Sequence, residues 1–104
     1  MNETQKTQAT LSLAILERRI IVFMYDRHFR KAIPATLGVS NNEYVMLSAY
    51  QIGGVHSNGS RREDWVFCNI MDISSLEITD CAFDKDPPNF KKNNTRLHKI
   101  IAEL

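Results

Sequence analysis

The chain is poor in the residues that would indicate a metal site, a disulfide framework or a membrane span. Only two of its 104 residues are cysteine, and the spacing of Cys68 and Cys81 matches no metal or redox motif. The longest apolar run, residues 20–25, is far too short to cross a bilayer, and the polar residues before Thr10 contain no signal peptide. We therefore expect a cytoplasmic protein without a membrane partner, in which both thiols are free.

Strong net charge is also lacking. The formal net charge is +1 at pH 7, so an attraction to nucleic acid would have to come from a local cluster of basic residues. Hydrophobic residues make up 43% and charged residues 24% of the chain, which is ordinary for a folded domain. At this length we expect a disordered polar leader over residues 1–9 and a single domain over residues 10–104.

The sequence offers little for catalysis. His28, His56 and His98 are scattered, and none has a cysteine close to it in the sequence. No nucleophile, base and orienting group occur at a spacing that would argue for a catalytic set, and no calcium-loop or two-metal spacing is present. We predict that the protein is not an enzyme and uses no metal ion or cofactor.

What the chain does contain is a series of short alternating apolar runs separated by turn residues. The pattern predicts a helix over residues 10–19 and strands over residues 20–25, 29–37, 43–52, 65–70 and 76–81. A short closing helix is predicted over residues 95–104, where Leu97, Ile100, Ile101 and Leu104 form an apolar stripe. The chain is therefore predicted to be mainly β, of the α+β class, with a small and strongly bent antiparallel sheet or barrel.

A donor-rich loop between two predicted strands is the most informative feature of the chain. One strand ends at Gly53-Gly54, the loop over residues 56–62 contains serine, asparagine and two arginines, and the next strand begins at Trp65. Tyr50 and Trp65 flank this loop and carry polar groups on aromatic rings, which suits them to frame a flat ligand. The alternative is that these aromatic residues belong to the core of a small barrel. The loop and its flanks predict a platform for an anionic or nucleotide-like ligand.

Three arginines are the candidates for phosphate contacts. Arg30 lies in the basic run of residues 27–31, and Arg61 and Arg62 lie in the donor-rich loop. A guanidinium group suits phosphate because it donates two parallel hydrogen bonds. The alternatives are a solvated hairpin tip for Arg30 and local ion pairs with the two following acidic residues for Arg61 and Arg62.

Landmarks along nearly the whole chain follow a familiar order. After an amphipathic helix come Phe23-Met24-Tyr25, Arg30, Pro34, Gly38, Leu47, Ala49-Tyr50-Gln51, Gly53-Gly54, Ser57, Gly59, Trp65, Phe67, Phe83 and Asn89-Phe90. Over roughly residues 10–104 this order resembles the WYL domain, in particular the short stand-alone WYL-like proteins of bacteria. Two positions depart from the family: Val45-Met46-Leu47 replaces the Trp-Tyr-Leu tripeptide, and Ser48 stands where the stand-alone branch often has arginine.

The resemblance implies an Sm-like five-stranded antiparallel barrel that acts as a sensor or regulatory module. Such domains usually follow a DNA-binding helix-turn-helix or occur near defence systems, and they bind nucleotides or nucleic acid through basic and aromatic residues. This chain has no room for a helix-turn-helix. We therefore expect a non-enzymatic regulatory or sensor module that binds an anionic ligand, a nucleotide or a single-stranded nucleic acid.

The alternative function is a protein-binding adaptor that modulates a larger effector, such as a phage-defence effector. A homodimer is a further possible partner arrangement, because a core of this size is marginal.

Overall fold

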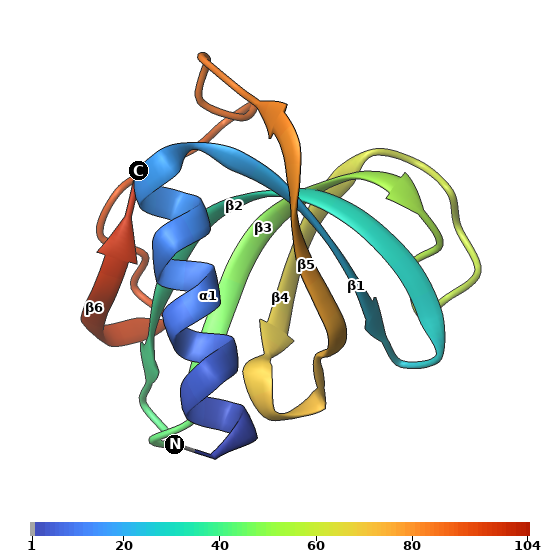
Figure 1. Cartoon of the computed structure of the whole chain (residues 1–104). Coiled ribbons are helices and arrows are strands. Elements are labelled where there is room, and N and C mark those ends of the chain that lie inside the picture. Colours follow the sequence, from blue (N-terminus) through green and yellow to red (C-terminus); the bar gives the residue numbers. More distant parts are fainter. Residues whose placement is uncertain (1) are drawn as a thin grey trace.

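The computed structural model describes residues 2–104, which form one helix packed against one antiparallel sheet (Figure 1). The elements are α1 (Glu3–Glu17), β1 (Arg19–Tyr25), β2 (His28–Ser40), β3 (Val45–Gly54), β4 (Asp64–Asn69), the 3-10 helix η1 (Ile70–Asp72), β5 (Ser74–Ala82) and β6 (Leu97–Glu103). The protein is mainly β and of the α+β class, and the predicted N-terminal helix and five strands are confirmed. Within residues 2–104 no helix is both long enough and apolar enough to span a membrane.

The sheet is strongly bent but open (Figure 1). Its strand order is β4-β3-β2-β1-β5, and β6 pairs with β2 outside this path. β2 is long enough to have two neighbours along one edge, because β1 pairs with residues 28–32 and β6 with residues 36–40. Pro34 has no N–H to donate, and it lies where β2 changes from one neighbour to the other.

The closed five-stranded barrel that we expected is not found in the described part of the chain. No ladder among residues 2–104 joins β4 to β5, which are the two ends of the strand order. The Tyr25 hydroxyl on β1 accepts a hydrogen bond from the Asn69 N–H at the end of β4, across part of this gap. The gap leaves β4 as an edge strand, and both cavities described below lie beside β4.

The core lies between α1 and one face of the sheet. Leu11, Ala14 and Ile15 form the buried stripe of α1 at the spacing of three and four residues that places side chains on one helix face. They pack with the buried strand residues Ile21, Phe23, Ala32, Leu37, Leu47, Ala49 and Cys68 and with Ile70 and Ile73. The opposite face of β3 and β4 is not covered by α1, and the larger of the two cavities described below lies against it.

The predicted closing helix over residues 95–104 is wrong, because residues 97–103 form β6. The ladder between β2 and β6 has two irregularities in register. A bulge inserts an extra residue and shifts the two-residue alternation of a strand. Leu97 is buried, and Ile101 and Leu104 pack against the core. These residues are four and three positions apart, which is also the spacing of residues on one face of a helix. The sequence pattern alone does not separate these two structures.

α1 begins at Glu3, well before the predicted start at Thr10. The expected disordered leader of residues 1–9 is therefore helical over residues 3–9, and Met1 lies outside the described residues. A capping box starts the helix: the Asn2 side chain accepts from the Gln5 N–H at 2.8 Å, and the Gln5 side chain accepts from the Asn2 N–H at 3.1 Å. The first turns are largely exposed, so no apolar periodicity indicates them in the sequence.

Candidate anion-binding site

Arg30 is a charged residue in the interior of the sheet. It lies on β2, paired with Phe23 of β1 and Gly54 of β3, and only 2% of its surface is exposed. Its Nη2 donates to the Ser57 hydroxyl at 2.8 Å and to the Tyr25 carbonyl oxygen at 3.3 Å. The guanidinium carbon lies 5.2 Å from the centre of the Tyr25 ring. Neutral groups and an aromatic face therefore hold the charge in place.

The positive charge of Arg30 has no counter-charge in the described chain. None of the ion pairs among residues 2–104 involves Arg30, and in this range its Nε is buried without a hydrogen-bond partner. Gln51 is 1% exposed and accepts from Arg30 Nη1 at 3.5 Å, and its own Nε2 also has no partner among these residues. Burying a charge without a counter-charge is costly. An anion that reaches these donors would reduce that cost.

A cavity of about 300 Å³ lies beside Arg30. It is lined by Tyr25, Arg30, His56, Ser57, Asn58, Val66, Phe67 and Cys68. No lining residue is acidic, and the loop between β3 and β4 contributes hydroxyl and amide groups. The volume is at the lower end of the range for ligand pockets, which suits a small anion or one phosphoryl group of a larger ligand.

The loop between β3 and β4 is closed by its own hydrogen bonds. The Gly59 N–H donates to the His56 carbonyl at 2.9 Å, and the His56 N–H donates to the Ser60 carbonyl at 2.8 Å. Several of the donors that the sequence offers are therefore used inside the loop. The Ser57 hydroxyl is directed to the cavity instead, where it accepts the hydrogen bond from Arg30.

Gly54 allows this loop to start directly beside Arg30. Its φ is +86°, and a Cβ built on it would overlap the Phe29 carbonyl oxygen and lie 2.9 Å from the Arg30 Cα. All of these atoms belong to the backbone of β2, so a side chain at this position would push the two strands apart. Glycine is required here both for its positive φ and for the close approach of the strands.

Two titrating groups beside Arg30 remain neutral around neutral pH. Burial raises the pKa of the Cys68 thiol to about 12, and the nearby charge of Arg30 only partly offsets this rise. Burial also raises the pKa of Tyr25, while the hydrogen bond from the Asn69 N–H acts in the opposite direction. Neither group supplies a negative charge to Arg30, which leaves the cavity with a net positive wall.

Tyr50 and Trp65 do not lie beside Arg30. Tyr50 precedes Gln51 on β3, and neighbouring residues of a strand face opposite sides of the sheet. Because Gln51 contacts Arg30, Tyr50 lies on the other face, where its ring meets the Trp65 ring edge-on with centres 5.6 Å apart. The single pocket that the sequence predicted is therefore two separate cavities, one at Arg30 and one at Trp65.

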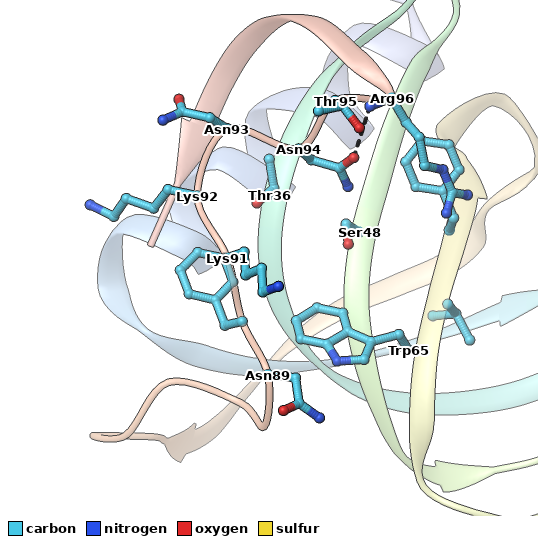
Figure 2. A pocket seen from close by; sticks show the side chains of 13 residues that line it. Thr36, Ser48, Trp65, Asn89, Lys91, Lys92, Asn93, Asn94, Thr95 and Arg96 are labelled. Atoms are coloured by element: carbon cyan, nitrogen blue, oxygen red, sulfur yellow. Dashed lines mark hydrogen bonds between the residues drawn. The ribbon is translucent and has the colours of Figure 1, made fainter.

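The cavity at Trp65 is a groove of about 610 Å³ (Figure 2). One side is formed by residues of β2, β3 and β4, and the other by the segment of residues 89–96. Trp65 Nε1 donates to the Pro88 carbonyl at 2.9 Å, and its ring lies 6.5 Å from the Phe90 ring at an angle of 23° between their planes. The Arg96 guanidinium lies 3.9 Å from the centre of the Phe67 ring. Aromatic faces and cations are thus combined in one groove.

Arg61 and Arg62 line neither of these two cavities. Both are exposed on the loop, and Arg62 forms an ion pair with Asp64 at 3.4 Å, as the local-pair alternative proposed. The structure does not bring either residue next to Arg30. Their part in ligand binding stays a prediction.

The groove contains functional candidates that the sequence analysis missed. Phe90, Lys91 and Arg96 come from a segment without regular strand or helix, which follows the prolines at 87 and 88. Their signal was an aromatic residue followed by basic residues, Phe90-Lys91-Lys92 and then Arg96, and aromatic and basic residues together are typical of surfaces that bind single-stranded nucleic acid. No periodicity marks such a segment, because its position depends on how β6 returns to β2.

Comparisons with models of known protein families, with curated proteins and with solved structures give no match for this chain. Within residues 2–104 no group of three or more histidine, cysteine, aspartate or glutamate side chains is placed to hold a metal ion.

Proposed function

We propose that the protein is a non-enzymatic regulatory or sensor module that binds an anionic ligand at Arg30. The observation that carries the proposal is Arg30, a residue that is 2% exposed and lies beside a cavity, and whose guanidinium group has no carboxylate partner among residues 2–104. The ligand would supply the missing counter-charge. Ser57 accepts from Arg30 and keeps its own hydroxyl proton, so it is able to donate that proton to the same ligand.

Phosphate is the ligand chemistry that this site favours. A guanidinium group donates two parallel hydrogen bonds in a plane, which matches two oxygens of a phosphoryl group. Each such pair of donors includes Nη2, which here donates to Tyr25 and Ser57. A phosphoryl oxygen would replace the Ser57 oxygen as acceptor and leave the Ser57 hydroxyl to donate to the ligand. The ligand is then a nucleotide or a single-stranded nucleic acid. The resemblance to the WYL domain supports the same class of ligand. We also propose that the fold is Sm-like, which is supported by a helix followed by five consecutive antiparallel strands.

The competing function is an adaptor that contacts a protein effector, or a second copy of this chain. Leu13 and Leu16 favour such a contact, because they are 47% and 75% exposed and lie about one turn apart on α1. The two functions differ in their dependence on salt. Phosphate contacts weaken steeply as ionic strength rises, whereas an apolar protein contact does not.

The test is thermal unfolding with increasing phosphate at constant ionic strength, for the unmodified protein and for Arg30→Gln. Ligand binding to the folded state at about ten times Kd stabilises it by about 1.4 kcal/mol. For a domain of this size that is a rise in Tm of roughly 6–11 °C. Arg30→Gln should abolish the part of the rise that comes from the site. Phosphate also stabilises proteins without a specific site, and the rise that remains in Arg30→Gln measures that background.

Lys6→Gln is the matched control, since it removes one positive charge from an exposed, paired position on α1 that belongs to neither candidate site. It should keep the full phosphate effect. Arg30→Lys keeps a charge without the planar fork and should show a reduced effect, which provides a second comparison if Arg30→Gln does not fold. Equal phosphate effects in the unmodified protein, Arg30→Gln and Arg30→Lys would refute the anion site and favour the adaptor.

A further inference from the structure

The groove at Trp65 has the chemical composition of a site for a nucleobase and its phosphate. Its thirteen lining residues, all within the described chain, include three aromatic rings and three cations and no acidic residue. Trp65 and Phe90 are half-buried, so part of each ring is open to the groove. Arg96 already covers the Phe67 ring, which leaves Trp65 and Phe90 as the available stacking surfaces.

The segment that walls the groove is tied down at both ends. Before the groove, the Arg18 guanidinium of the C-cap of α1 forms an ion pair with Asp86, and the Phe83 N–H donates to the Arg18 carbonyl at 3.0 Å. Within it, the Asn93 N–H donates to Glu103 of β6 at 3.2 Å, and β6 begins directly after it at Leu97. These contacts anchor the backbone of the segment beside the sheet. A preformed wall lowers the entropic cost of binding a flat ligand.

Figure 2 shows where the charges of this wall lie. The Lys91 side chain points toward Trp65, whereas the Lys92 side chain points away from the groove. The Arg96 guanidinium lies over Phe67, on β4 like Trp65. A base stacked on Trp65 or Phe90 would thus have cations on either side for the phosphate that it carries. Stacking on aromatic rings does not depend on base identity, because every base has a π-face.

We propose that this groove is a second ligand site, which takes a nucleobase bearing a phosphate, either as a free nucleotide or as one residue of a single strand. Stacking against Trp65 and Phe90 binds the base, and Lys91 and Arg96 bind the phosphate. The groove and the Arg30 cavity lie on opposite sides of β4 and share the lining residues Val66 and Phe67. The groove site does not require the Arg30 cavity to be occupied.

Trp65 provides a direct probe of this site, because it is the only tryptophan of the chain. Its fluorescence is measured during titration with adenosine monophosphate, with ribose 5-phosphate and with a short single-stranded oligonucleotide. Adenosine monophosphate and the oligonucleotide should quench it saturably, and ribose 5-phosphate, which has no base, should not. Tighter, salt-dependent binding of the oligonucleotide assigns the site to a single strand, and equal affinity for both assigns it to a free nucleotide.

Two variants test the roles of the ring and the charge. Phe90→Ala should weaken binding about tenfold or more, since one stacked base contributes on that scale. Lys91→Gln should weaken it and lower its dependence on salt. Tyr44→Ala and Lys85→Gln remove an exposed ring and an exposed charge outside the groove, and should leave the affinity unchanged.

Arg30→Gln separates this site from the Arg30 cavity. It should abolish the phosphate effect on Tm and leave the quenching of Trp65 by adenosine monophosphate intact. Absence of saturable quenching, equal quenching by ribose 5-phosphate, or affinities unchanged in both Phe90→Ala and Lys91→Gln would overturn the groove site, whatever the outcome for Arg30.

Discussion

Two glycines with nearly the same backbone conformation provide a test of how Arg30 is positioned. Gly54 has φ +86° and Gly59 has φ +87°, and they lie at the start and in the middle of the loop between β3 and β4. A Cβ at Gly59 would meet no atom of residues 2–104 within 4 Å, whereas a Cβ at Gly54 would lie 2.8 Å from the Phe29 carbonyl carbon and 2.9 Å from the Arg30 Cα. Substitution by alanine therefore adds the same backbone strain at both sites and steric overlap at only one.

The expected magnitudes follow from this difference. Positive φ in alanine costs about 1–2 kcal/mol, which is the whole expected loss of unfolding free energy for Gly59→Ala. Gly54→Ala adds overpacking against backbone atoms, which costs about 1–3 kcal/mol more. Relief of this overlap must also move the backbone of Arg30, because Arg30 pairs with Gly54 in the β2–β3 ladder. We therefore expect Gly54→Ala, and not Gly59→Ala, to reduce the phosphate effect on Tm.

Urea unfolding, followed by circular dichroism and by Trp65 fluorescence, measures the two free energies. The phosphate titration of each variant, at a temperature where both are folded, measures the effect on the site. Equal destabilisation of the two variants would refute the steric argument. A full phosphate effect in Gly54→Ala would show that the close approach of β3 to β2 does not position Arg30.

Two further predictions concern the buried thiol and the last strand. The unfolding free energy should fall as pH rises from 9 toward 12, because the unfolded thiol of Cys68 ionises near 9.0 and the folded thiol near 12. The contribution of Cys68 to stability is fully present below about pH 9 and falls by about 1.4 kcal/mol per pH unit between about pH 9 and about pH 12. Urea unfolding at about pH 8 and about pH 10 measures this loss, which should disappear in Cys68→Ala but not in Cys81→Ala. Gly38→Ala should loosen β6, because its Cβ would lie 2.5 Å from the Lys99 carbonyl oxygen. Amide hydrogen exchange should then accelerate over residues 97–103 more than over β4, with a loss of roughly 1–3 kcal/mol in stability.

Much of the secondary structure was predictable because it depends on local patterns. Alternating apolar residues place strands, and turn residues end them, so the five strands from β1 to β5 were found near their true bounds. The early start of α1 was not, because an exposed helix needs no apolar periodicity and the capping pair of Asn2 and Gln5 was its only signal. β6 was mistaken for a helix, because its bulged ladder with β2 gives the apolar residues helical spacing.

Arg30 shows most clearly what a local pattern leaves open. In the sequence it belongs to a basic run that suggests a solvated hairpin tip, and it stands next to the apolar Phe29. In the structure Phe29 is 51% exposed and Arg30 is buried. The reason is register: Arg30 pairs with Phe23 of β1, which belongs to the core face, so the alternation of β2 turns the charge inward and the ring outward.

The α+β class, the five central strands and the residue types suited to anion binding could be predicted without a structure. These follow from periodicity, turn chemistry and side-chain chemistry, which act over a few residues. Which candidates lie together depends on the tertiary fold. It placed Arg30 and Ser57 in one cavity and Trp65 and Phe90 in another, because cross-strand register and the return of β6 to β2 bring together residues far apart in the chain. Such long-range placement depends on the packing of the whole sheet, and no short stretch of sequence contains it.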